Sequence, residues 1–225
     1  PLHATAVGKV LLAHGTDHQK EKFLKPLLNG EKRICYSMTE KAAGADATGM
    51  QTRAEKKGNS AYMLNGEKWF SSAASAADIA LVMAKTNPDA PRHQQYSTFI
   101  VELPNPGYNI IRDIKTMAVE GPLSHIMGGG HSEVEIKDLE VPAENLLGGE
   151  GNGFNMGQHR LAYGRLRHGM HNVAMAQRAL DMATKHVTSR STFGKKLSER
   201  QGVQFMLADC ASELYMARLM LLHIA

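Results

Sequence analysis

Two segments of the sequence place short hydrogen-bonding side chains beside groups that could hold a flat ligand. The first, Ser37-Met38-Thr39-Glu40, ends an apolar run and leads into the small residues Gly44-Ala45-Asp46, whose backbone amides could face a ligand. The second contains Asn65-Gly66, typical of a tight hairpin turn, and then the only tryptophan, Trp69, before two serines. Such groups suit a planar heteroaromatic ring with polar edges. Ordinary packing of a tryptophan within a sheet is the simpler alternative.

A third segment gathers cationic side chains near the end of the chain. It runs from Arg190 through Thr192 and Phe193-Gly194 to a pair of lysines, and Arg200-Gln201 follow it. An arginine guanidinium can bind two oxygens of a diphosphate at once, and the lysines would add positive charge. Cations near the C-terminus of a helix also interact favourably with its dipole, so this segment alone does not require a ligand.

The pattern along the chain predicts three parts that would position these segments. Residues 1–32 show helical spacing of apolar residues and are expected to form the end of an N-terminal helical domain. Residues 33–147 contain short strands separated by Gly, Pro and Asn turns, and residues 148–225 return to helical spacing. The predicted fold class is α+β, with an antiparallel β-barrel or sandwich between helical segments and a C-terminal bundle of long helices.

Specific elements follow from the same pattern. The continuous apolar run from Ile79 to Ala84 predicts a strand that is buried on both faces. The stretch from Phe154 to about Ser189 contains no proline and predicts one long helix. A second long helix is expected from about Glu199 to Ala225, with its apolar residues on one side at Val203, Leu207, Leu214 and Leu221.

Composition argues against several classes of protein. The 225 residues are 43% hydrophobic and 21% charged, as in globular proteins, and no apolar stretch approaches the roughly 20 residues that span a bilayer. Two cysteines are too few for a disulfide framework or a zinc site, and the 11 histidines lack acidic partners at ligand spacing, so no metal site is predicted. The charge of +4 permits an anionic ligand, but lysine and arginine form no dense run of the kind that binds nucleic acid.

With the three segments in order, the chain resembles the acyl-CoA dehydrogenase family over nearly its whole length. The first segment resembles the family's T-E-P-G-A-G-S-D run, the second its strand with W-I-T or W-S-S, and the third its R-x-x-F-G-K turn. The stretch 141–154 is similar to the V-P-x-x-N-x-L-G…G-x-G-F joint, and 201–209 is also close to the family pattern. The resemblance implies FAD-dependent dehydrogenation of an acyl-CoA thioester, with electrons passed to an electron-transfer flavoprotein.

The resemblance also implies which residues bind FAD. Thr39 would hydrogen-bond the pyrimidine edge of the flavin, Trp69 would pack against the ring system, and Ser71 would lie near flavin N5. The residues from the third segment would reach the FAD of a neighbouring subunit in a homodimer or homotetramer. The implied cofactor-binding set is Tyr36, Ser37, Met38, Thr39, Ala45, Trp69, Phe70, Ser71, Arg190, Thr192 and Gln201.

The acyl-CoA substrate is expected to meet a short segment of the long helix, with Arg165 holding the thioester. This segment is Tyr163, Gly164, Arg165 and Leu166. No catalytic base is assigned, because the family carries its glutamate either on a later segment or at the position of Gly164. Three departures from the first motif bear on cofactor affinity: Lys41 stands for proline, Ala42 for glycine and Ala45 for serine.

Two alternatives stay open. A flavin oxidase or monooxygenase of the same superfamily would share the fold but let oxygen reach the reduced flavin. A non-catalytic relative that binds nucleic acid or a protein partner is suggested by the basic pI of about 9.0 and the altered first motif. The first residues resemble neither a signal nor a transit peptide, and we expect either the bacterial cytoplasm or the mitochondrial matrix as the compartment.

Overall fold

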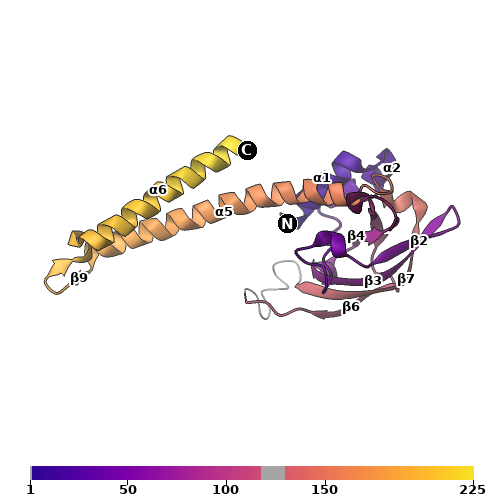
Figure 1. Cartoon of the computed structure of the whole chain (residues 1–225), viewed down its shortest axis with the longest axis horizontal. Coiled ribbons are helices and arrows are strands. Elements are labelled where there is room, and N and C mark those ends of the chain that lie inside the picture. Colours follow the sequence, from indigo (N-terminus) through magenta and orange to yellow (C-terminus); the bar gives the residue numbers. More distant parts are fainter. Residues whose placement is uncertain (1, 118–129) are drawn as a thin grey trace. The chain divides into compact units, whose positions relative to one another are not determined.

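The structure is a computed structural model that describes residues 2–117 and 130–225. The chain forms two compact units, Pro1–Leu161 and Ala162–Ala225. Figure 1 shows the sheet and short helices of the first unit and the long helices that make up the second. The α+β class is confirmed, whereas the predicted boundaries at residues 32 and 147 stay a prediction.

The first unit is built around one mixed sheet. Neighbouring strands follow the order β6-β7-β3-β2-β4-β5-β8, and β1 pairs with β4 outside this path. The strands are β1 (Ile34–Ser37), β2 (Arg53–Lys57), β3 (Ala61–Ser72), β4 (Ile79–Lys85), β5 (Tyr96–Glu102), β6 (Tyr108–Asp113), β7 (His131–Pro142) and β8 (Leu146–Leu147).

Most strand pairs are antiparallel, as predicted, but β1 runs parallel to β4. Its register pairs Ile34 with Ile79 and Ser37 with Val82. Parallel neighbours need a long connection, and here β2 and β3 lie between the two strands in the chain. The predicted antiparallel arrangement therefore does not hold at β1, the strand that leads into the first predicted segment, nor where Arg53 of β2 pairs with Lys85 of β4 in parallel.

The predicted hairpin turn at Asn65-Gly66 is wrong. β3 continues through this pair because β7 pairs with it on both sides, with a shift of register between Leu64 and Gly66. Gly66 has φ of 152°, and a Cβ there would lie 2.6 Å from Thr52 Cα. The pair thus forms a bulge, where only glycine lets β2 approach so closely.

β7 is likewise one continuous strand. Asp138 interrupts its apolar pattern with φ of 48°, and its backbone N–H donates to Asn65 Oδ1 at 2.8 Å. The irregularities of β3 and β7 therefore lie opposite one another, and the pairing continues past both.

β4 is buried on both faces, which confirms the prediction from its apolar run. Its odd-numbered residues, such as Leu81 and Met83, pack in a core with the N-terminal helices and β1. Its even-numbered residues, such as Ala80 and Val82, pack in a second core with β3 and β7. The alternation follows from the pleat of a strand.

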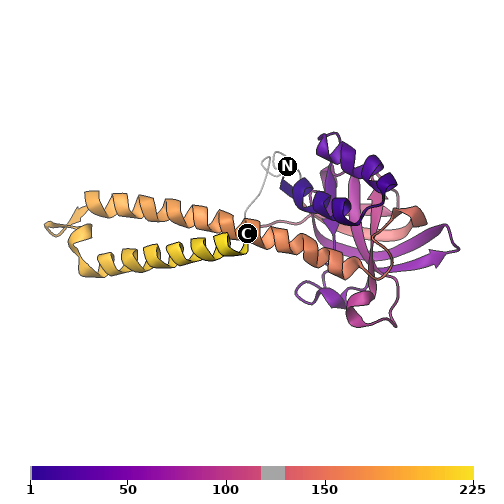
Figure 2. The same cartoon turned by 90° about the horizontal axis from the view of Figure 1, so that it is seen from above.

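Short helices cover one face of this sheet, as Figure 2 shows. They are α1 (Leu2–His14), α2 (Asp17–Gln19) and α3 (Lys25–Leu28), and a π-helical segment, Lys20–Leu24, joins the last two. Leu11 and Phe23 are fully buried against the sheet. Thr16 starts α2 with a capping box, in which its hydroxyl accepts from the Gln19 N–H and the Gln19 side chain accepts from the Thr16 N–H.

The second unit consists of two antiparallel helices joined by a small hairpin (Figure 2). Its elements are α5 (Gly153–Ser189), which begins in the first unit, β9 (Ser191–Thr192), β10 (Lys195–Lys196) and α6 (Gln201–Ile224). Leu214 is buried, and Val203, Leu207 and Leu221 are half-buried while most of α6 is exposed. Both long helices and the apolar side of α6 confirm the prediction. No helix in the described ranges is long and apolar enough to cross a membrane.

Candidate functional site

The segment after β1 presents hydrogen-bonding groups that have no partner. Ser37 is wholly buried, and its hydroxyl lies 2.8 Å from that of Tyr108. Met38 and Thr39 follow and are half-buried. In the part of the chain that the structure describes, neither the backbone N–H nor the hydroxyl of Thr39 forms a hydrogen bond. Partly buried polar groups without partners are available to a ligand.

A buried ion pair fixes the backbone beside Thr39. The Lys68 ammonium is fully buried, donates to the Met38 carbonyl oxygen at 3.1 Å and lies 2.8 Å from Glu40 Oε1. The Glu40 carboxylate also accepts from the backbone N–H groups of Gln51 at 2.6 Å and Thr52 at 3.0 Å. Every oxygen of this carboxylate is therefore occupied, and Glu40 is unsuited to act as a catalytic base.

Burial lowers the pKa of Lys68 to about 8, and the charge of Glu40 opposes this shift. Burial also acts to raise the pKa of Glu40, but the charge of Lys68 and the hydrogen bonds to the carboxylate outweigh it, so that this pKa lies below its ordinary value. Both groups are consequently charged at neutral pH.

Trp69 connects the second predicted segment to the first. Its backbone N–H donates to the Thr39 carbonyl oxygen at 2.7 Å, so β3 and the end of β1 are held together at this point. Its half-buried indole lies near two cations, with Lys41 Nζ 4.9 Å and Arg112 Cζ 5.5 Å from the ring centroid. Both cations pair with Glu133, Arg112 through its Nε at 2.7 Å. Lys41 is thus directed at Trp69 and Glu133.

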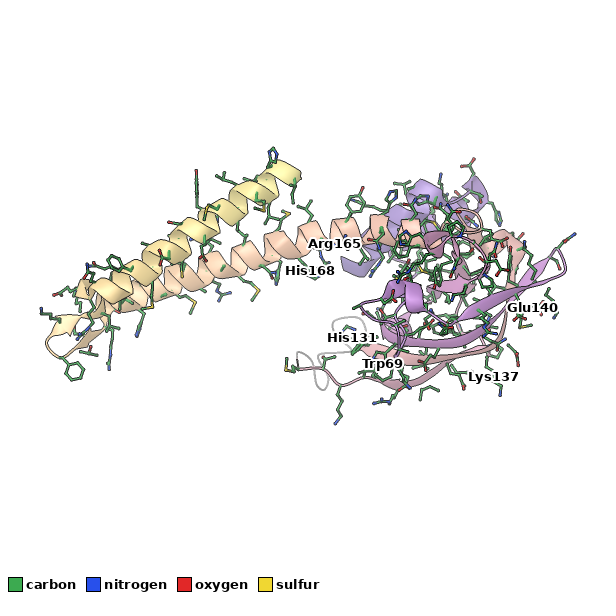
Figure 3. All side chains as sticks on the ribbon, in the orientation of Figure 1. Trp69, His131, Lys137, Glu140, Arg165 and His168 are labelled. Carbon is green, nitrogen blue, oxygen red and sulfur yellow. The ribbon has the colours of Figure 1, made fainter. Side chains whose placement is uncertain are left out.

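The chain bulges directly after Trp69. Phe70 has φ of 54° and its ring is 44% exposed, whereas the Ser71 hydroxyl is buried and has no partner among the described residues. Ser72 is half-buried, and its Oγ lies 2.8 Å from Nδ1 of His131, whose ring is 6.1 Å from that of Phe70. Figure 3 shows Trp69 and His131 at the same end of the sheet. Phe70 is therefore more exposed than Trp69, and Ser72 is more exposed than Ser71.

Tyr36 lies beneath the first turns of α5. Its hydroxyl is buried without a partner among the described residues, and a Cβ on Gly157 would lie 3.3 Å from it. The Arg160 guanidinium lies 4.6 Å from the centroid of the Tyr36 ring. Burial raises the pKa of Tyr36 to about 12 and lowers that of Arg160. Tyr36 therefore supports the site from within the core.

Ala45 lies in an exposed loop after the bridge between Glu40 and Ala43. The following Asp46 accepts from the Thr48 N–H at 3.1 Å and pairs with Arg92 at 2.9 Å, so that the loop has a defined shape. The exposed backbone of this loop leaves room for a ligand.

The third segment lies in the second unit, at the turn between α5 and α6. Arg190 and Gln201 are exposed, and within the described ranges the Arg190 guanidinium forms no hydrogen bond or ion pair. Thr192 is half-buried, and its carbonyl oxygen accepts from Arg200 Nη2 at 2.7 Å. Arg200, which the sequence analysis named beside this segment but did not assign to the cofactor, holds the turn, and its Cζ lies 5.9 Å from the centroid of the Phe193 ring.

The residues expected to meet acyl-CoA lie on one stretch of α5. Tyr163 and Arg165 are exposed, and Gly164 and Leu166 are half-buried. A Cβ on Gly164 would meet no atom within 4 Å, so this position has free space around it. Figure 3 shows the Arg165 side chain on the helix in the second unit.

A cavity of about 470 Å³ lies beside Lys41 and is lined by glutamates, including Glu67, Glu133 and Glu135. Lys41 and Arg112 already neutralise part of this charge through Glu133. The cavity shares Glu40 and Lys41 with the candidate site but not the Thr39 donor. The described residues contain no cluster of three His, Cys, Asp or Glu side chains that could hold a metal ion.

Comparison with known proteins identifies the family. The model for the acyl-CoA dehydrogenase middle domain matches residues 35–128, and that for the C-terminal domain matches residues 151–225. Acyl-CoA dehydrogenase family member 11 of Gallus gallus is 41% identical over 96% of this chain and 28% of its own length. A subunit of the caffeyl-CoA reductase–Etf complex of Acetobacterium woodii is 36% identical over 97% of this chain and 55% of its own.

Solved structures of known proteins are also similar to this chain. Butyryl-CoA dehydrogenase from Megasphaera elsdenii matches with a TM-score of 0.84 and 35% identity, over 96% of this chain and 54% of that one. The prolyl acyl carrier protein oxidase AnaB matches with a TM-score of 0.87 and 28% identity, over 99% and 56%. The chain belongs to the acyl-CoA dehydrogenase family. This membership supports its classification as an oxidoreductase. It spans about half, or less, of the length of these relatives.

Proposed function

We propose that this chain is the cofactor-binding part of an FAD-dependent acyl-CoA dehydrogenase. The observation that carries the proposal is the Thr39 segment, whose N–H and hydroxyl lack partners among the described residues while the carbonyl groups on both sides are held in place. A donor set of this kind fits the polar edge of a flavin ring, and the accessible Phe70 ring beside it fits a flat face. The whole protein's substrate and partners form part of the proposal, because the chain covers only part of its relatives.

Within this proposal, the residues have distinct tasks. Thr39 binds the pyrimidine edge of the ring, and Phe70 and Ser72 take the places first predicted for Trp69 and Ser71. Bound FAD would accept a hydride from the β-carbon of the thioester while a base removes the α-proton. Arg165 would hold the thioester group. None of the residues in the described part of the chain is assigned as that base.

The third segment supplies the proposed link to assembly. Arg190, without a partner in the described ranges, would bind the FAD diphosphate of a neighbouring subunit in a homodimer or homotetramer. The guanidinium fork suits two phosphate oxygens. An electron-transfer flavoprotein as the electron acceptor is supported by the similarity to a subunit of an Etf complex. The compartment stays an expectation.

A flavin oxidase is the second candidate. It is favoured by the similarity to AnaB, whose name describes an oxidase. The dehydrogenase relatives are more similar in sequence, at up to 41% identity, and we therefore place dehydrogenation first.

The test is anaerobic titration of the FAD-loaded, full-length enzyme with acyl-CoA thioesters. Loss of the visible flavin absorbance on addition of an acyl-CoA is expected, followed by reoxidation with an electron-transfer flavoprotein. Rapid reoxidation by oxygen with release of hydrogen peroxide would support the oxidase instead. A protein that cannot be loaded with FAD would refute both.

A further inference from the structure

Packing of the core does not require a buried ion pair at Lys68 and Glu40. Lys68 is fully buried and Glu40 is 3% exposed, whereas the other ion pairs in the described ranges lie at the surface. Taking two charges out of water is costly, and apolar residues of similar size often serve a core as well or better. A function for the lysine charge is therefore worth seeking in what it contacts.

Lys68 acts on one particular peptide group. Its ammonium donates to the Met38 carbonyl oxygen at 3.1 Å, and this carbonyl belongs to the same peptide group as the Thr39 N–H. A cation on the oxygen of a peptide draws electron density away from its nitrogen and makes the N–H a stronger donor. Hydrogen bonds joined in this way strengthen one another in a medium of low dielectric.

The far end of this peptide is the unpartnered donor of the candidate site. The Thr39 N–H forms no hydrogen bond within the described ranges, and the Trp69 N–H holds the Thr39 carbonyl at 2.7 Å, so that the N–H cannot turn away easily. The charge of Lys68 thus reaches the site through the backbone, although its side chain is inaccessible.

We infer that Lys68 is a positioning residue that polarises the Met38–Thr39 peptide, so that the Thr39 N–H binds the flavin more tightly in its reduced form than in its oxidised form. The inference rests on the proposed function. Reduction places negative charge on the pyrimidine edge of a flavin, and a preorganised donor aimed at developing charge stabilises it without reorganisation. Lys68 would in this way raise the reduction potential of the bound cofactor.

A purely structural role is the competing explanation. As a structural clamp, Lys68 would fix the end of β1 and contribute to stability. Its loss would then lower the affinity for oxidised FAD and for reduced FAD equally. Reduction potential separates the two roles, because it depends only on the ratio of the two affinities.

The experiment uses the full-length, FAD-loaded enzyme and measures the flavin reduction potential against reference dyes. The main variant, Lys68→Met with Glu40→Gln, removes both charges together and leaves no uncompensated ion. Glu40→Gln alone removes the counter-charge that opposes the lowering of the Lys68 pKa, so this variant and the wild type are compared at acidic pH, where Lys68 keeps its proton. Lys57→Gln is the matched control, because Lys57 of β2 pairs with Glu140 of β7 but is exposed.

For the double variant we expect about a tenfold loss of preference for the reduced form, equivalent to about 30 mV for a two-electron couple. Glu40→Gln is expected to leave the potential at or above that of the wild type, and Lys57→Gln to leave it unchanged. A double variant that binds FAD with the wild-type potential would overturn the inference but not the proposed function.

If the double variant does not fold, Glu40→Gln decides, because a potential below that of the wild type contradicts the polarising role. A wild-type protein that binds no FAD removes the proposed function and this inference together.

Discussion

The buried ion pair gives the sharpest prediction about stability. Lys68→Met alone leaves Glu40 as a buried carboxylate without its cation, and breaking such a pair from one side costs about 3–5 kcal/mol. The pair is 0% and 3% exposed, so solvent offers little screening. Adding Glu40→Gln removes the stranded charge, and we expect the double variant to be more stable than Lys68→Met alone.

The assay is urea unfolding followed by the fluorescence of Trp69, the only tryptophan of the chain and the direct neighbour of Lys68. Lys68→Met should lower the midpoint without changing the slope, and the double variant should recover part of the loss. If the costs of Lys68→Met and Glu40→Gln simply add, the two residues are not coupled and the reasoning from the pair is refuted.

Further predictions concern acid stability, the bulge and the two ligand-binding segments. The pKa of Glu40 lies below its ordinary value of 4.5, so its contribution to the free energy of unfolding is complete above that pH and is lost as the pH falls through the folded pKa. Glu40→Gln should therefore reduce the loss of stability at acidic pH. An unchanged acid part of the pH–stability curve would contradict the assignment. Gly66→Ala should lower the urea midpoint, because its Cβ would lie 2.6 Å from Thr52 Cα, and wild-type stability would argue against the bulge. Trp69→Phe should leave FAD affinity nearly unchanged if Phe70 is the ring-facing residue, and a large loss would instead support the prediction that Trp69 packs against the flavin. Arg190→Lys should weaken FAD binding by the assembled enzyme, and unchanged affinity would assign this arginine to the helix end.

Elements with a strong local pattern could be predicted from the sequence. The apolar run of β4 predicts a strand with two buried faces. The spacing of Val203, Leu207, Leu214 and Leu221 predicts the side of α6 that is least exposed. These patterns need no knowledge of distant partners. The family could also be recognised, because its motifs lie in order along the chain.

Features that depend on distant partners could not be predicted. Asn65-Gly66 carries a turn signal, but pairing with β7 on both sides keeps β3 extended there. The bulge after Trp69 changes the exposure of the side chains there, so that Phe70 is exposed and Trp69 half-buried, while Ser72 is half-buried and Ser71 buried. The Lys68–Glu40 pair joins residues on different elements, and neither residue alone indicates burial.

The central claim is that the Thr39 segment and its neighbours on β3 bind FAD. The most direct measurement is titration of the cofactor-free, full-length enzyme with FAD, monitored by the fluorescence of Trp69, in a form in which any other tryptophan is replaced by phenylalanine. The account predicts saturable quenching with a matching change in the visible flavin spectrum. FAD that binds without affecting Trp69, or no saturable binding at all, would contradict it.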